Sequence, residues 1–112
     1  MIYTELKVAN ETYKLRLNTQ NLIGLEKELG CNPLGIFGDG TTIPTVEQMV
    51  NILYYSALQL NHGFTKANAY EVFDNYLSEG NLITDFLTVI LEIYKSSGLI
   101  AQDLDESAVK NA

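Results

Sequence analysis

The sequence predicts an α+β fold, mainly α, in which an N-terminal β-hairpin packs on a bundle of about four helices. Two observations predict this class. Apolar residues alternate with polar ones over about the first 17 residues, and from there to about residue 100 they recur every three or four positions. At 112 residues and 46% hydrophobic side chains, we expect one domain over residues 1–100. The polar tail over residues 101–112 is expected to be disordered.

The chain opens with two predicted strands. Leu6 and Val8 alternate with charged residues in the first strand, and the same alternation runs from Tyr13 to Leu17 in the second. Asn10 lies between the strands and tolerates the positive φ that a tight turn needs. Because an isolated hairpin is marginally stable in water, its apolar face is expected to lie on the helices.

The first predicted helix begins at Asn18 or Thr19, since either residue can cap it. Gly30 is placed to end it in a left-handed conformation. Asn32-Pro33 then fits the start of a single helical turn. The residues expected on the apolar side of the helix are Leu22, Ile23, Leu25 and Leu29.

A capping box over residues 45–48 opens the second predicted helix, which extends to about Leu60 and is apolar nearly all round. Such a helix is either central in the bundle or presents a second face to another protein. Tyr54 and Tyr55 are adjacent, so they point about 100° apart and cannot both face one core. We therefore expect one of these tyrosines at an edge or an interface.

Two further helices complete the predicted bundle. Thr65 caps one over about residues 66–78, and Asn81 caps the last over about residues 82–97, which ends at Gly98 in a Schellman motif. The residues expected to face the core are Ala69, Val72, Phe73, Tyr76 and Leu77 in the third helix and Ile83, Phe86, Leu87, Ile90 and Tyr94 in the last.

The net charge of −7 is concentrated in the helical part. Residues 39–98 carry seven acidic side chains against two basic ones, whereas residues 1–38 are balanced. An acidic body repels phosphates, so we expect no nucleic-acid partner. From the residues present we expect no signal peptide and no membrane span, and the single cysteine fits a reducing compartment.

No catalytic, cofactor or metal site is predicted. Residues 74–85 resemble a calcium-binding helix-loop-helix, but the glycine falls at loop position seven rather than six, position three is Tyr76, and the twelfth position holds Asp85 instead of the longer glutamate. Cys31, expected to be a small buried hydrophobe, and His62, expected near a helix C-terminus, lack the signature of a nucleophilic pair. One cysteine and one histidine cannot supply a zinc site. A helix-loop-helix regulatory or metal-responsive module remains the alternative class.

The sequence resembles a known family in its caps, glycines and core residues, over about residues 3–100. It is similar to the tail assembly chaperones of long-tailed bacteriophages and prophages of Gram-positive bacteria. The segments that carry this resemblance are Thr12–Leu17, Leu25–Gly30, Asn32–Phe37, Ile43–Val50, Asn61–Gly63, Ala69–Asp74 and Asp85–Leu91.

The resemblance implies a non-enzymatic function in the cytoplasm of a host bacterium. Such proteins bind the tape-measure protein and keep it soluble until tail tube subunits displace them, so none is expected in the mature virion. The resemblance also implies self-association into oligomers and a longer frameshifted product that extends the polar tail. The residues expected to contact a partner are Tyr54, Tyr55, His62 and Phe64.

Overall fold

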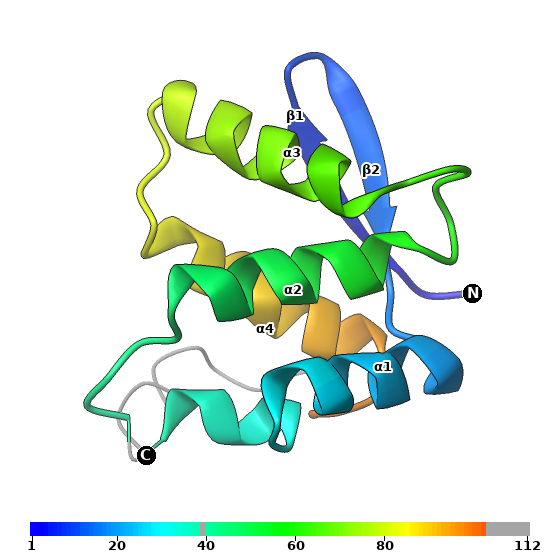
Figure 1. The fold of residues 1–112 in the computed structure, drawn as a ribbon, viewed down its shortest axis with the longest axis vertical. Coiled ribbons are helices and arrows are strands. Elements are labelled where there is room, and N and C mark those ends of the chain that lie inside the picture. The colour runs from blue at the N-terminus through cyan, green and yellow to red at the C-terminus, as the bar shows by residue number, and fades with distance from the viewer. Residues whose placement is uncertain (39, 103–112) are drawn as a thin grey trace.

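A computed structural model describes residues 1–38 and 40–102, and it confirms the fold class that the sequence predicts (Figure 1). An antiparallel two-stranded hairpin precedes four α-helices and a short 3-10 helix. The predicted tail, except for residues 101 and 102, lies outside the described residues. The elements are β1 (Thr4–Val8), β2 (Glu11–Leu15), α1 (Thr19–Leu29), η1 (Pro33–Phe37), α2 (Val46–Ala57), α3 (Lys66–Ser78) and α4 (Asp85–Ser96).

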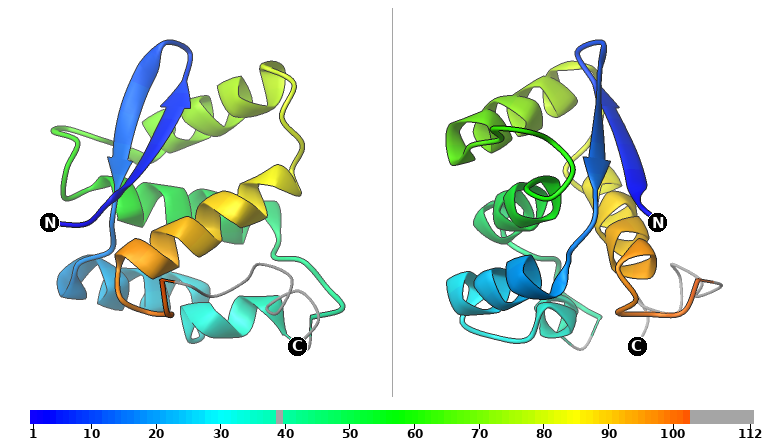
Figure 2. Two further views of the ribbon diagram at one scale, coloured as in Figure 1. Left: turned by 180° about the vertical axis from the view of Figure 1, so that it is seen from behind. Right: turned by 90° about the vertical axis from the view of Figure 1, so that its right-hand side faces the viewer.

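The elements form two layers, seen edge-on in the right-hand view of Figure 2. Helices α1, α2 and α3 lie side by side in one layer, and the hairpin and α4 form the other. Helix α2 is central, because it contacts α1, α3, α4 and β2. This position explains why α2 is apolar around most of its circumference.

The hairpin pairs Leu6 with Tyr13 and Val8 with Glu11, which leaves a two-residue turn. The apolar residues of both strands therefore face the helices. The turn residues Ala9 and Asn10 both have positive φ, of 51° and 64°. This matches the type I′ turn whose twist suits a hairpin, and it confirms the expectation for Asn10.

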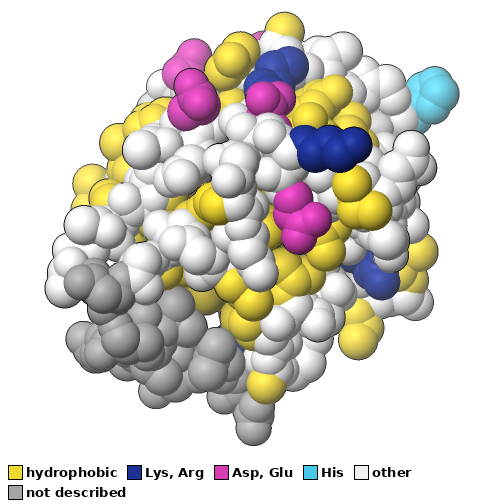
Figure 3. All heavy atoms as spheres, turned by 60° about the horizontal axis from the view of Figure 1, so that its bottom comes forward, with side chains coloured by type: hydrophobic (Ala, Val, Ile, Leu, Met, Phe, Trp, Pro, Cys, Tyr) yellow, Lys and Arg dark blue, Asp and Glu magenta, His cyan; other side chains and the backbone are white. Residues whose placement is uncertain are grey.

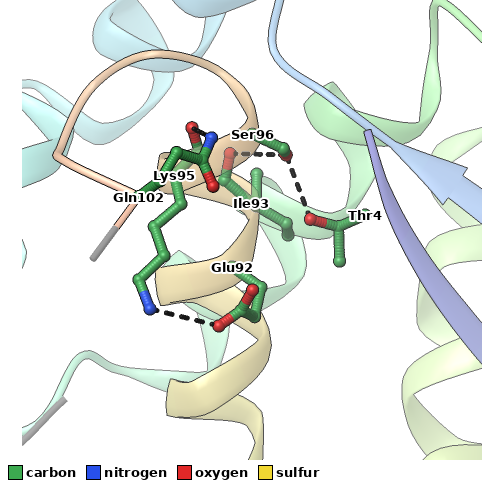
Figure 4. Close-up of polar contacts among 6 residues, drawn as sticks. All are labelled: Thr4, Glu92, Ile93, Lys95, Ser96 and Gln102. Atoms are coloured by element: carbon green, nitrogen blue, oxygen red, sulfur yellow. Dashed lines mark hydrogen bonds and ion pairs between the residues drawn. The ribbon is translucent and has the colours of Figure 1, made fainter. Parts of the chain in front are cut away.

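Hydrogen bonds tie the start of the chain to the end of α4 (Figure 4). The Ser96 hydroxyl donates to the Ile93 carbonyl, so the Thr4 hydroxyl donates to Ser96 Oγ, at 3.0 Å. On the outside of the same helix end, the Gln102 amide donates to the Lys95 carbonyl at 2.7 Å. The Lys95 carbonyl, one of the last four of α4, also accepts from the Gly98 amide.

Most helix ends follow the predicted capping chemistry. Asn18 accepts a hydrogen bond from the Asn21 amide at the start of α1, and the Thr45–Gln48 capping box is complete. Thr65 caps α3 through the Asn68 amide. The Leu99 amide donates to the Tyr94 carbonyl, which gives α4 the predicted Schellman end.

Two helix boundaries differ from the prediction. Helix α2 ends at Ala57 rather than near Leu60, and α4 begins at Asp85 rather than Leu82. Asn81 does not cap α4; its side chain donates instead to the Tyr76 carbonyl at the end of α3. The Asp85 carboxylate accepts from the Leu82 amide, and the Asp85 amide donates to the Leu82 carbonyl, so bonds between residues three apart close the turn that precedes α4.

Four residues expected in the core or on an apolar face are exposed: Ile23, Val46 and Ile83, and also Cys31. Ile83 precedes the shortened α4, and Val46 is the first residue of α2, so neither reaches the core layer. Ile23 adjoins Leu22, which is half-buried, and only Leu25 of α1 is fully buried. The apolar stripe of α1 is therefore narrower than expected.

Tyr94 is the largest fully buried side chain, and it joins η1 to α4. Its hydroxyl donates to the Pro33 carbonyl at 2.9 Å, and its ring meets Phe37 edge-on at 6.4 Å. Burial, with a smaller effect from Cys31, raises the pKa of Tyr94 well above its usual value. The buried phenol thus favours its neutral, hydrogen-bonded form.

Replacing Ala9 by glycine should stabilise the protein. A non-glycine residue in the left-handed region costs roughly 1–2 kcal/mol, and the greater freedom of glycine in the unfolded chain offsets part of the gain. We expect Ala9→Gly to raise the free energy of unfolding by roughly 0.5 kcal/mol in urea titrations. Ala67→Gly, an exposed position in the first turn of α3, is the matched control and should lower it by roughly 0.5–1 kcal/mol. A loss of stability in both variants would contradict the strain at Ala9.

Tyr94→Phe should change the dependence of stability on pH. Because the pKa of Tyr94 is higher in the folded protein than in the unfolded chain, its contribution is complete below pH 10 and is lost as pH rises further. The loss amounts to about 1.4 kcal/mol per pH unit for one group. We expect Tyr94→Phe to be about 1–2 kcal/mol less stable at pH 8, from the unpaired Pro33 carbonyl, but to lose stability less steeply above pH 10. Urea titrations at pH 8, 10 and 11 test this, and equal slopes for the two proteins would contradict it.

Candidate functional site

The four residues predicted to contact a partner lie on two separate surfaces. His62 and Phe64 belong to the turn between α2 and α3 and face the hairpin, whereas Tyr54 and Tyr55 lie near the end of α2 beside α1. We name the first surface the hairpin groove. It is a hollow of about 470 Å³ lined by Ala9, Glu11, Tyr13, Asn61, His62, Phe64, Asn68, Glu71, Val72 and Asn75.

Asn61 fixes the position of the hairpin groove. Its side-chain amide accepts from the Lys14 amide at 3.2 Å and donates to the Lys14 carbonyl at 2.7 Å, as a neighbouring strand would. It also donates to the Ala57 carbonyl at the end of α2. The turn after α2 is thereby held against the outer edge of β2, which places His62 and Phe64 next to the hairpin.

The hairpin groove combines an aromatic wall with negative charge. The rings of Tyr13 and Phe64 meet edge-on at 5.8 Å. Glu11 and Glu71 line the hollow, and they raise the pKa of Tyr13 together with the larger effect of its partial burial. Both carboxylates therefore act on the same aromatic side chain, and the groove suits apolar and cationic groups better than anions.

Tyr54 and Tyr55 form the second aromatic surface, and both are half-buried. Their rings meet edge-on at 5.0 Å, and neither ring lies fully in the core. Tyr55 lies against the backbone of α1 at Gly24, where an added Cβ would come within 2.7 Å of the ring atom Cε1. The expectation that one tyrosine lies at an edge therefore applies to both.

Lys66 covers the outside of Tyr54. Its ammonium lies 5.2 Å from the centre of the Tyr54 ring and 3.5 Å from Glu28 Oε1. The side chain thus connects the start of α3 with the end of α1 across the face of α2. Both ends of the ion pair are partly exposed, so its contribution to stability is small.

The segment that resembles a calcium loop uses its polar groups for local structure. Asp85 accepts from the Leu82 amide, Asn81 donates to the Tyr76 carbonyl, and Ser78 donates to the Asp74 carbonyl. Within the described residues, no group of three or more histidine, cysteine, aspartate or glutamate side chains is placed to hold a metal ion.

Cys31 and His62 lie at opposite ends of the helical layer. Cys31 follows the end of α1, and His62 follows the end of α2, and these neighbouring helices run in opposite directions (Figure 1). Both side chains are exposed. His62 lies five residues beyond the end of α2, so the interpretation of His62 as a helix-terminal residue is wrong.

Sequence reasoning missed several residues of the hairpin groove. The sequence assigned Tyr13 only to a strand packed on helices, and it gave Glu71 no role. A usable signal exists on α3, where polar residues recur at helical spacing at Asn68, Glu71 and Asn75 beside the apolar stripe. The role of Asn61 has no such signal, because its partners in β2 are distant in sequence.

These surfaces belong to a small domain that is mainly α. None of the helices within the described residues is long and apolar enough to cross a membrane. The chain belongs to the family described as "Family of unknown function (DUF6096)", which matches residues 4–112. Neither a curated protein nor a solved structure matches the chain.

A double-mutant cycle tests the contact between Tyr55 and Gly24. In the Tyr55→Ala background the ring is gone, so Gly24→Ala should gain up to about 1 kcal/mol of helix propensity. With Tyr55 present, the ring must move, and the same substitution should be less favourable by about 1 kcal/mol or more. Urea titrations of the four proteins give the coupling. Gly35→Ala, whose added Cβ meets nothing within 4 Å, is the control and should show no coupling to Tyr55. A zero coupling for Gly24 would contradict the close contact.

Proposed function

We propose that this protein is a tail assembly chaperone of a long-tailed bacteriophage or prophage. In this proposal it binds the tape-measure protein in the host cytoplasm and keeps it soluble until the tail tube polymerises. It acts without catalysis, and copies of the chain associate with one another along the bound partner. Tube subunits would displace it, so it would be absent from the mature virion.

The observation that carries this proposal is the pair of half-buried aromatic clusters at the surface. Tyr13 with Phe64, and Tyr54 with Tyr55, each combine apolar area with a polar tip. Such residues are enriched in protein interfaces. Further hydrophobic side chains reach the surface in separate patches between charged groups, as Figure 3 shows for one face. A surface of this kind suits repeated, reversible contact with a long apolar partner.

The resemblance in sequence supports the same function. Its segments coincide with the caps and turns that set the arrangement of the elements, among them Gly30, the Asn32–Pro33 turn and the capping box that begins at Thr45. The acidic helical part keeps the free chain apart from nucleic acid. Release by tube subunits requires modest affinity at each copy, with the overall strength supplied by many copies on one partner.

Co-expression with the tape-measure protein encoded beside it tests the proposal. The tape-measure protein should be insoluble when expressed alone and should co-purify with this chain as a soluble complex containing several copies of it. Size-exclusion chromatography with light scattering would give the stoichiometry. If the tape-measure protein remains insoluble and no complex forms, the proposal fails.

Substitutions on the aromatic clusters localise the contact. The double substitution Tyr54→Ala and Phe64→Ala should reduce the amount of soluble tape-measure protein at least about 5-fold, which corresponds to about 1 kcal/mol or more of lost contact. Leu82→Ala, at an exposed apolar residue between α3 and α4, is the matched control and should have no effect. Circular dichroism confirms that both variants are folded.

A further inference from the structure

Asn51 is a buried polar residue with an unused hydrogen-bonding group. Only 4% of its surface is exposed, and it lies on α2, the central helix. Within the described residues, its Oδ1 is the one buried side-chain oxygen or nitrogen that has no hydrogen-bond partner. A buried amide oxygen without a partner costs free energy in the isolated protein. Such a cost calls for an explanation in function.

Asn51 lines a hollow of about 200 Å³ on the outer side of the helical layer, which we name the Asn51 hollow. Its other lining residues are Glu28, Glu47, Val50, Lys66 and Tyr70. Glu47 and Asn51 are one turn apart on α2, and Lys66 and Tyr70 are one turn apart on α3, so each pair shares a side of its helix. Glu28 closes the hollow from the end of α1.

The charges of the hollow favour a cation. Two carboxylates face one ammonium, and the Lys66 ammonium is already paired with Glu28 at 3.5 Å. Glu47 forms no ion pair within the part of the chain that the structure describes. The hollow therefore carries an excess negative charge, an unused amide oxygen and, in Tyr70, an aromatic side chain that is 56% exposed.

We propose that the Asn51 hollow binds an arginine side chain of a partner protein. A guanidinium has five donors in one plane, so it can donate to Asn51 Oδ1 and to the Glu47 carboxylate at once while its face lies on the Tyr70 ring. An anion would meet both carboxylates, and a neutral amide would leave Glu47 unpaired.

The inference deepens the proposed function, and it rests on that function only for the identity of the partner. If the tape-measure protein is the partner, an arginine on one of its helices would occupy the hollow, and exposed apolar residues of α1 and α2 would contact the rest of the helix. Ile23 and Val46 are the exposed apolar side chains of those two helices. The site itself is testable without any partner.

The probe is N-acetyl-arginine amide, titrated into the isotope-labelled protein and followed by NMR. We expect saturable shifts at the Asn51 side-chain amide and at the backbone amides of residues 47–51 and 66–70. The dissociation constant should be on the order of 10 mM, as for a small ligand held by one ion pair and one charge-assisted hydrogen bond. N-acetyl-citrulline amide, which has nearly the same shape and no charge, should bind at least about 5-fold more weakly. The absence of saturable shifts at these residues, or equal binding of the two probes, would overturn the proposal.

Two variants and one control variant complete the test. Glu47→Gln should weaken arginine binding at least about 3-fold, whereas Glu71→Gln in the hairpin groove is the matched control and should leave it unchanged. Asn51→Leu should abolish the binding and raise the midpoint of thermal unfolding by about 4 °C or more, because the unpaired amide is removed. Equal effects of the two glutamate substitutions would overturn the proposal, as would unchanged binding by Asn51→Leu. A negative result removes the arginine site and leaves the co-expression test of the chaperone function intact.

Discussion

The fold depends on how the chain passes from the hairpin to α1 through the core. Leu15 and Leu17 are fully buried on either side of Arg16, so the backbone between them cannot bond to water. The Arg16 amide donates to the Ser56 carbonyl at 2.8 Å, and the Leu17 amide donates to the Ser97 hydroxyl at 2.9 Å. One bond reaches α2 and the other reaches the end of α4, so this short segment joins the two layers. A two-stranded hairpin has little stability of its own and needs this attachment.

The central position of α2 determines which of its residues remain for function. Helices α1, α3 and α4 and strand β2 cover most of its circumference, so its apolar residues are largely consumed by the core. What remains at the surface is its first turn, with Val46 and Glu47, the half-buried pair Tyr54 and Tyr55 and the floor of the Asn51 hollow. The sequence offers two explanations for a helix that is apolar nearly all round, a central position and a second contact face. The two explanations are therefore compatible on one helix.

Local features were predictable from the sequence because their causes are local. The type of each element, the Thr45 and Thr65 caps and the Schellman end of α4 each depend on residues within one helical turn. The start of α4 was not predictable in this way, since Asn81 and Asp85 offer competing side-chain bonds to the same turn.

The candidate site was only half predictable, for a different physical reason. The sequence analysis nominated Tyr54, Tyr55, His62 and Phe64 as partner contacts, but it could not show that these four residues lie on two separate surfaces. That division depends on Asn61, whose bonds to Lys14 bring the turn after α2 to the hairpin. Asn51 was equally invisible, because an asparagine inside a helix is solvated unless neighbouring helices bury it.

Helix α3 contributes residues to both the hairpin groove and the Asn51 hollow. The two sites lie on opposite sides of its buried stripe, which consists of Ala69, Val72, Phe73 and Tyr76. Asn68, Glu71 and Asn75 line the hairpin groove, and Lys66 and Tyr70 line the Asn51 hollow. On both flanks carboxylates outnumber ammonium groups and lie beside aromatic rings. A partner helix with alternating apolar and basic residues would therefore meet the same chemistry on either side of α3. In the proposed function, two chemically similar surfaces on one small domain would let several copies hold a long partner, although neither surface binds tightly.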